Sequence, residues 1–263
     1  MLVQDQYQEW CHVRMLKWHG HGNDPTGLKG TGHGECVVHC LACPQPGVIM
    51  GPEKSVKEQY LDQLFVRVDA NFRLIRLNVS NDIRNPGLNH GKGTVASGVG
   101  AVICTRHNMW RPCSVMDLHK GEDYLHMDYC VLSSLQHDTP RDIIISYDIA
   151  CQWGVNFWER VGIYGSDLVL VQTPDNITFL VPKFHLAAHI KKCQQTHSFN
   201  KTPGVGQTDG EAPEHTWASS NLVASSTKEM GPGSQRDTLD DHFNNHNWCK
   251  VIMFDELRSR LQL

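Results

Sequence analysis

The chain has 263 residues, 40% of them hydrophobic, and a formal net charge of -4. This length suits one large domain or two small ones with a buried core. The negative net charge argues against a generally basic nucleic-acid coat, so any such contact would use local patches such as Lys183 with Lys191 and Lys192. No apolar stretch approaches the roughly 20 residues that cross a bilayer. The N-terminus lacks the pattern of a signal peptide, so no membrane contact is expected.

The first part of the chain has the composition of loops. Residues 20–34 are crowded with Gly, His, Asp and Thr, and a short segment rich in Cys and His follows at 36–43. We therefore expect residues 1–60 to form a loop-rich Cys/His knuckle region and residues 61–250 to form the core domain. Residues 251–263 are expected to start a C-terminal helix or tail.

The core region begins with strands and continues with helices and strands in alternation. Residues 61–79 alternate apolar and polar side chains, which is typical of one or two half-buried strands. Residues 80–100 are rich in Asn, Gly and Pro and predict a loop. The further expected elements are a helix at 121–136, a buried strand at 143–145, a helix at 150–161, a strand at 177–184, and helices at 186–195, 211–223 and 237–261. This order predicts an α/β domain.

Three acidic residues occupy positions from which their carboxylates can converge. Asp69 closes one apolar stretch, Asp148 follows a second, and Glu214 lies in a later polar segment, with Glu211 as an alternative. Two strand-end Asp residues and a Glu on a later helix are how ribonuclease-H-like nucleases and transposases gather carboxylates around two divalent metals. Mg²⁺ prefers such oxygen ligands. Asp148 alone also fits the N-cap of the next helix, but the three residues together favour a metal site.

The ten cysteines and sixteen histidines suggest a second kind of metal site. Without an export signal, such cysteines favour metal ligands or free thiols over disulfides. His185, His189 and Cys193 follow one another at four-residue spacing, so on one helix they would share a face suited to Zn²⁺. The alternative is a partly buried helix on which these side chains only pack. Cys104 and His107 could supply further ligands, which gives a hypothetical site of Cys104, His107, His189 and Cys193.

Cys40 and Cys43 predict half of a zinc knuckle. A single Cys-x-x-Cys pair is weak evidence, because a strong prediction needs a second pair at suitable spacing. A redox role is less well supported, since no βαβ pattern surrounds the pair. The residues that we considered as its missing ligands are Cys11, His19, His21 and His33.

Longer segments of the chain carry more information than these spacings. They are Val68–Leu74, Ser146–Trp153, Val181–Leu186, Thr208–Glu214 and Ala224–Gly233, preceded by Cys40–Gly47. In these segments the chain resembles the fungal Kyakuja–Dileera–Zisupton (KDZ) transposases, and the likeness extends over about residues 19–250.

The resemblance implies a ribonuclease-H-like transposase core, a mixed sheet flanked by helices, that acts on DNA in the nucleus. It makes Asp69, Asp148 and Glu214, with Glu211 as the alternate, the carboxylates that hold Mg²⁺ or Mn²⁺. Cleavage of transposon ends and their transfer to target DNA would follow two-metal phosphoryl-transfer chemistry. Structural zinc and a homo-oligomer are further expectations. Trp217 keeps an aromatic position of the related hAT transposases, whereas His215 stands where those have Arg.

The chain also departs from the family pattern. Between residues 78–80 and 98–100, KDZ relatives carry a longer segment with another Cys-x-x-His pair, so we expect an internally deleted copy. If that pair shares zinc with Cys104 and His107, half of the site is lost. Three hypotheses follow. The first is a transposase core, either active or an inactive relic, and the second is a non-catalytic zinc-stabilised module derived from a transposon that binds DNA or protein. The third is a fragment that does not fold stably alone, which a broken sheet beside Asp69 would support.

Overall fold

The computed structural model describes residues 2–48, 50, 58–77, 93–165 and 168–261, except for the side chains of residues 2–5, 27–28, 59, 212–215 and 256–261. The helices are α1 (Leu2–Trp18), α2 (Tyr124–Leu135), α3 (Ala150–Trp153), α4 (Phe157–Val161), α5 (Lys183–Leu186), α6 (Lys191–Thr196), α7 (Ala212–Ser220), α8 (Ala224–Thr227) and α9 (Pro232–Leu261). The strands are β1 (Leu64–Asn71), β2 (Arg76–Leu77), β3 (Thr94–Ala96), β4 (Gly98–Cys104), β5 (Met109–Leu118), β6 (Ile143–Ser146) and β7 (Ile177–Leu180). Short 3₁₀ turns are η1 (His21–Asn23), η2 (Gly27–Gly30), η3 (Gln59–Asp62), η5 (Pro174–Asn176) and η6 (Asn221–Val223).

A five-stranded mixed sheet in the order β5-β4-β1-β6-β7 forms the centre of the fold. The central strand β1 runs antiparallel to β4 and parallel to β6, and β6 runs parallel to β7. A second, two-stranded sheet joins β2 and β3. This mixed sheet with its helices confirms the expected α/β architecture. The broken sheet beside Asp69 that would support an unstable fragment is not found, because Asp69 pairs with Ala101 of β4.

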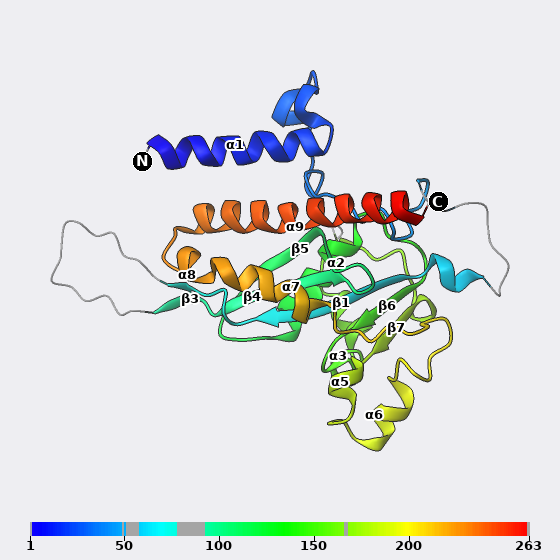
Figure 1. Cartoon of the computed structure of the whole chain (residues 1–263). Helices are drawn as coiled ribbons and strands as arrows, with labels where there is room; N and C mark the ends of the chain where they lie inside the picture. The colour runs from blue at the N-terminus through cyan, green and yellow to red at the C-terminus, as the bar shows by residue number, and fades with distance from the viewer. Residues whose placement is uncertain (1, 49, 51–57, 78–92, 166–167, 262–263) are drawn as a thin grey trace.

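Helices cover both faces of the five-stranded sheet. Successive strand residues point to opposite faces, and β4 illustrates this: Val102 belongs to the core cluster with Met127 of α2, whereas Ile103 belongs to the cluster with Phe243 of α9. In Figure 1, α9 crosses the sheet and α1 runs alongside α9. None of the helices in the described ranges is long and apolar enough to cross a membrane.

The helices predicted at 150–161 and 186–195 are each interrupted. The first is divided into α3 and α4, and Gly154 is the C-cap residue of α3. The second is divided into α5 and α6, and Ile190 between them has the extended backbone of φ -62° and ψ 154°.

Two further expectations about loops are wrong in part. The region expected as a loop at 80–100 contains β3 and the start of β4, while its residues 80–92 lie outside the described part. The region expected to be loop-rich begins with α1. This helix is fixed to α9 by the stacked rings of Trp18 and Trp248, whose centroids lie 4.9 Å apart.

Candidate functional site

Asp69 and Asp148 lie at the same end of two neighbouring parallel strands. Arg67 of β1 pairs with Ser146 of β6. Asp69 and Asp148 each come two residues after that pair, so the parallel register brings them to one end of the sheet. Asp148 is not the N-cap of α3, because Ile149 holds that position without a side-chain hydrogen bond. The sequence prediction that the two strand-end carboxylates converge therefore agrees with the geometry.

The buried guanidinium of Arg67 connects the carboxylates. Its Nη2 donates to Oδ1 of Asp148 at 2.9 Å and lies 4.0 Å from Oδ1 of Asp69. Its Nη1 donates to Oε2 of Glu211 at 2.8 Å and also to the carbonyl oxygen of Gly210. One side chain with no exposed surface thus contacts all three acidic residues, which we call the carboxylate cluster (Asp69, Asp148 and Glu211).

Sequence reasoning missed Arg67. The available signal was a charged side chain inside the apolar run of β1, two residues before Asp69 and therefore on the same face of the strand. A fully buried Arg is rare unless it is paired. An Arg in a buried strand therefore predicts acidic partners from the sequence alone.

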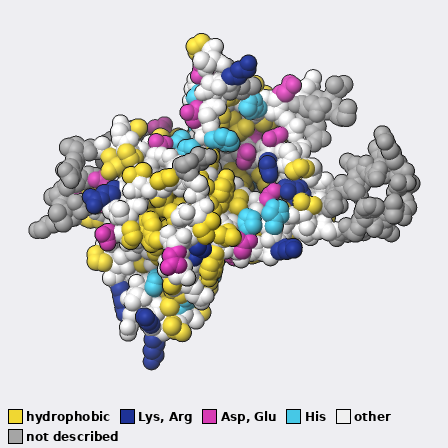
Figure 2. All heavy atoms as spheres, turned by 180° about the vertical axis from the view of Figure 1, so that it is seen from behind, with side chains coloured by type: hydrophobic (Ala, Val, Ile, Leu, Met, Phe, Trp, Pro, Cys, Tyr) yellow, Lys and Arg dark blue, Asp and Glu magenta, His cyan; other side chains and the backbone are white. Residues whose placement is uncertain are grey.

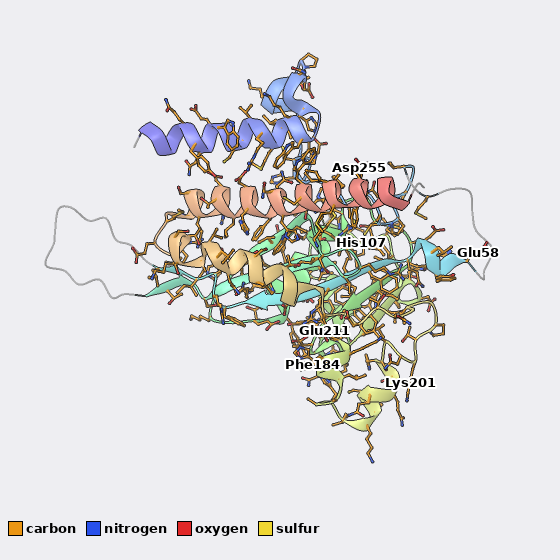
Figure 3. The ribbon with its side chains drawn as sticks, in the orientation of Figure 1. Glu58, His107, Phe184, Lys201, Glu211 and Asp255 are labelled. Carbon is orange, nitrogen blue, oxygen red and sulfur yellow. The ribbon has the colours of Figure 1, made fainter. Side chains whose placement is uncertain are left out.

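Neighbouring groups fix the orientation of the carboxylates. Nε1 of Trp217 donates to Oδ2 of Asp69 at 2.7 Å. The backbone N–H of Phe184 donates to Oε1 of Glu211 at 2.9 Å, and Figure 3 shows these two residues beside each other. Nδ1 of His185 lies 3.6 Å from Oδ2 of Asp148. The cluster is therefore held from β1, from α5 and from the start of α7.

A glycine permits the close approach of this last segment. Gly210 has φ +85°, in the left-handed region that L side chains rarely adopt. A Cβ atom at this position would lie 2.8 Å from Oγ of Ser146 and 2.9 Å from the ring of Phe199. Only glycine therefore lets the chain pass Ser146 closely enough for Glu211 to reach Arg67.

The structure brings the alternate glutamate, Glu211, into the cluster. Glu214 belongs to α7, but its side chain lies outside the described residues. The assignment of Glu214 as the third carboxylate therefore stays a prediction. Glu211 precedes α7 as its N-cap residue, and its carboxylate forms an ion pair with Arg67.

The charge of the cluster suits a divalent cation. The side chains of Asp69, Asp148 and Glu211 are 18%, 34% and 17% exposed, so they are partly open to solvent. Three carboxylates against one guanidinium leave two negative charges uncompensated. Burial raises the pKa of Asp69 to about 6, although the charge of Arg67 and the hydrogen bond from Trp217 oppose this shift. Carboxylate oxygens are the ligands that Mg²⁺ and Mn²⁺ take, although these three side chains are not among the described groups whose ligand atoms all lie within 4.8 Å of one another.

A separate cluster of Cys40, Cys43, Cys104 and His107 has the donor set of a zinc site. Nδ1 of His107 lies 3.2 Å from Sγ of Cys40, 3.5 Å from Sγ of Cys43 and 3.3 Å from Sγ of Cys104. Ligand atoms around tetrahedral zinc are roughly 3.5–3.8 Å apart, given the usual zinc–ligand bond lengths. All four atoms lie within 4.8 Å of one another, so this zinc-type cluster could bind a structural metal.

The thiols and the imidazole of this cluster shift one another's pKa values. Burial lowers the pKa of His107, but its hydrogen bonds to Cys104 and Cys40 and their charges raise that pKa to about 10. Hydrogen bonds from Cys40 and Cys43 lower the pKa of the Cys104 thiol. To bind a metal, His107 would have to lose this proton and act as a neutral imidazole, and the cysteines would bind as thiolates, so metal binding would release protons.

The sequence hypotheses about zinc paired the ligands wrongly. Cys104 and His107 meet Cys40 and Cys43, and not His189 and Cys193. The ligands considered for Cys40 and Cys43, namely Cys11, His19, His21 and His33, are not part of their cluster. The inference that the Cys104 site has lost half its ligands is also wrong, because Cys40 and Cys43 supply the second pair.

His189 and Cys193 belong to a third group, with Cys151 of α3. Sγ of Cys151 lies 3.3 Å from Nδ1 of His189, and the three ligand atoms lie within 4.8 Å of one another. His185 is not part of this group but faces Asp148. The expected single helix face is therefore absent from residues 183–196, which are all described, because the chain turns between α5 and α6.

Three lysines lie on α5 and α6, the helices that follow β7. Lys191 and Lys192 are exposed on α6, and Lys183 is half-buried on α5. Figure 2 shows Lys and Arg side chains at the lower end of the molecule, the end at which α6 lies in Figure 1. Lys183, Lys191 and Lys192 are the residues of one local patch that the sequence suggested for a nucleic-acid contact.

A family model described as Kyakuja-Dileera-Zisupton transposase matches residues 88–247, which is more than half of the chain. That range includes Asp148 and Glu211, whereas Asp69 and Arg67 precede it. Searches of curated proteins and of solved structures find no match.

Proposed function

We propose that this chain, which belongs to the Kyakuja-Dileera-Zisupton transposase family, is a catalytic core that cleaves and transfers DNA strands with divalent metal ions. The observation that carries the proposal is the convergence of Asp69, Asp148 and Glu211 around Arg67. A half-buried carboxylate with a raised pKa lowers stability at neutral pH, and such groups concentrate at functional sites. A module that only binds DNA or protein does not need this cluster.

We further propose that the sheet is a ribonuclease-H-like core. Support comes from Asp69 on the central strand, Asp148 after its parallel neighbour, and a glutamate at the start of a later helix. The domain boundaries near residues 60 and 250, which the sequence pattern suggested, stay proposals. An internal deletion and a nuclear location, which the family resemblance implies, also stay proposals.

The residues of the cluster would act by holding and orienting oxygen ligands. Asp69 and Asp148, with Glu211 or Glu214, would hold the metal, and Arg67 would hold the carboxylates around its guanidinium while it offsets one of their charges. Nε1 of Trp217 donates a hydrogen bond to Oδ2 of Asp69 and so orients the carboxylate, which leaves Oδ1 as the oxygen available to a metal. When bound, a divalent cation would activate the attacking oxygen and stabilise the leaving oxygen of a phosphodiester.

Membership of a transposase family implies DNA binding. Lys191 and Lys192 extend from α6 beside the segment that carries His185, which itself faces Asp148. We propose that these lysines contact the phosphate backbone of DNA whose scissile bond lies at the carboxylate cluster.

A nicking assay tests the proposed activity. The full chain would be incubated with supercoiled plasmid and linear duplex in Mg²⁺ or Mn²⁺, and compared with Asp148→Asn. Asp175→Asn is the matched control, because Asp175 is exposed in η5 and outside the cluster. We expect metal-dependent nicking by the wild-type and control proteins only. DNA binding without nicking by the wild-type protein in either metal would instead support the non-catalytic module.

A further inference from the structure

Three metal-ligating side chains from two separate segments meet next to the carboxylate cluster. Cys151 lies on α3, His189 lies between α5 and α6, and Cys193 lies on α6. All three are half-buried, and the Sγ atom of Cys151 is 3.3 Å from Nδ1 of His189. Two thiols and one imidazole form a donor set that favours zinc over the harder Mg²⁺.

The backbone turn between α5 and α6 explains how His189 and Cys193 converge. Ile190 is extended, so α6 starts in a new direction directly after His189. The side-chain amide of Gln194 donates to the carbonyl oxygens of His189, at 2.6 Å, and of Ala187, at 3.3 Å, which closes the turn. The turn therefore presents the two ligands toward Cys151.

This segment has little apolar packing to hold it. All residues of α5 and α6 are described, and none of them is buried. Phe184 and Ile190 are 85% and 70% exposed. Segments that cannot bury enough apolar surface commonly depend on a metal or another cross-link for their order.

The three ligands leave one side open to solvent. They line a cavity of about 730 Å³, together with Lys192, Thr196 and His197. Nδ1 of His197 is already hydrogen-bonded to Oγ1 of Thr196 at 2.7 Å. Zinc with three protein ligands completes its tetrahedron with a solvent molecule at such an open position.

We propose that Cys151, His189 and Cys193 form a zinc site of their own, and that this metal positions the residues around Asp148. Cys151 comes three residues after Asp148, and His189 comes four residues after His185, whose imidazole faces Asp148. A metal that joins Cys151 to His189 and Cys193 therefore fastens α3 to the α5–α6 segment. The same segment carries Phe184, whose backbone N–H donates to Glu211. The metal site is independent of the proposed function, whereas its effect on cleavage rests on that function.

Metal content and cobalt spectroscopy test the site. The full chain would be purified with zinc, and its zinc content measured by mass spectrometry. We expect about two zinc ions per wild-type chain, one in each Cys/His cluster. Cys193→Ser and the milder His189→Gln should each lower the zinc content by about one ion per chain. The control Cys249→Ser changes an exposed Cys of α9 outside both clusters and should leave the zinc content unchanged. Wild-type zinc content in both Cys193→Ser and His189→Gln would overturn the proposal.

A second variant isolates the new site. In the double variant Cys40→Ser with Cys43→Ser, which leaves the other cluster with only Cys104 and His107, Co²⁺ should give the intense visible bands of a tetrahedral ion and the charge-transfer absorption of two thiolates. Adding Cys193→Ser should remove these bands, and their persistence would contradict the assignment.

The positioning role is tested by activity. His189→Gln should lower Mg²⁺-dependent nicking at least ten-fold while its far-UV circular dichroism stays unchanged. Loss of zinc with full nicking would refute the positioning role, whereas a wild-type chain that never nicks DNA would refute the proposed function and leave the zinc measurement valid.

Discussion

Arg67 and Asp148 lie 81 residues apart in the sequence, yet Nη2 of Arg67 donates to Oδ1 of Asp148 at 2.9 Å. The parallel pairing of β1 with β6 makes this contact possible, because it places Asp148 one strand away from Arg67. Arg67 has no exposed surface, so solvent does not screen its charge. The fold and the candidate active site are therefore joined through one ion-pair network.

Removal of Arg67 should destabilise the protein strongly. Arg67→Met leaves three carboxylates without their buried partner, and breaking a buried ion pair in this way costs about 3–5 kcal/mol. Arg67→Lys should cost less, although an ammonium cannot bridge Asp148 and Glu211 as a planar guanidinium does. Urea denaturation measures the free energy of unfolding of both Arg67 variants. Arg73→Met is the control, because Arg73 is exposed. Equal stability of Arg67→Met and the wild-type protein would contradict the network.

The ionisation of Asp69 should lower stability as the pH rises. Its pKa is about 6 in the folded protein, chiefly because of burial, and about 3.9 when unfolded. The folded state therefore holds the proton more tightly, and the stabilisation from protonated Asp69 is lost as the pH rises through about 6. Asp69→Asn can still accept the hydrogen bond from Trp217.

Asp69→Asn should therefore be more stable than the wild-type protein at pH 7, by up to about 3 kcal/mol. The difference between the two proteins should shrink as the pH falls from 7 to 5. Urea denaturation across this range, without added Mg²⁺, measures it. A difference that does not change with pH would show that Asp69 titrates at an ordinary value.

Loss of the cluster of Cys40, Cys43, Cys104 and His107 should loosen the attachment of residues 36–48 to β4 and β5. Cys40→Ser should lower the melting temperature of the zinc-loaded protein by on the order of 5–10 °C, because metal binding energy contributes to folding. Cys249→Ser is the matched control. If Cys40→Ser has the same melting temperature as the control and keeps its full zinc content, this cluster does not bind the metal.

The lysines of α6 should contribute to DNA affinity through charge. Lys191→Gln with Lys192→Gln should weaken binding to any DNA sequence and reduce the slope of log affinity against log salt by about two. Lys17→Gln with Lys29→Gln removes the same charge from exposed positions near the N-terminus. Fluorescence anisotropy over a salt series compares the two double variants. Equal slopes would exclude α6 as the DNA contact.

Sequence patterns located the strands that carry the acidic residues but not the group that joins them. The runs before Asp69 and Asp148 are apolar and end in a carboxylate, so both strands were predictable. Arg67 was not, because a charge inside a buried strand opposes the hydrophobic pattern. β5 was also missed: Arg111 and Pro112 interrupt its apolar pattern, and this edge strand of the sheet can accept a proline.

The ligand groups could not be paired from sequence because they depend on contacts between distant segments. Cys43 and Cys104 are 61 residues apart and meet where the knuckle region packs against the end of β4. Four-residue spacing predicted a common helix face for His185, His189 and Cys193, and no Gly or Pro marks the turn at Ile190. The turn sends His185 toward Asp148 and the other two toward Cys151.

The most direct test of the central claim is Mn²⁺ binding to the zinc-loaded protein, followed by electron paramagnetic resonance. Wild-type protein and Asp175→Asn should bind Mn²⁺ with equal affinity, whereas Asp148→Asn should bind at least ten-fold more weakly, because it removes a charged oxygen ligand. Glu211→Gln and Glu214→Gln, measured in the same titration, would identify the third carboxylate. Equal Mn²⁺ affinity of Asp148→Asn and the wild-type protein would contradict the assignment of the carboxylate cluster as the catalytic metal site.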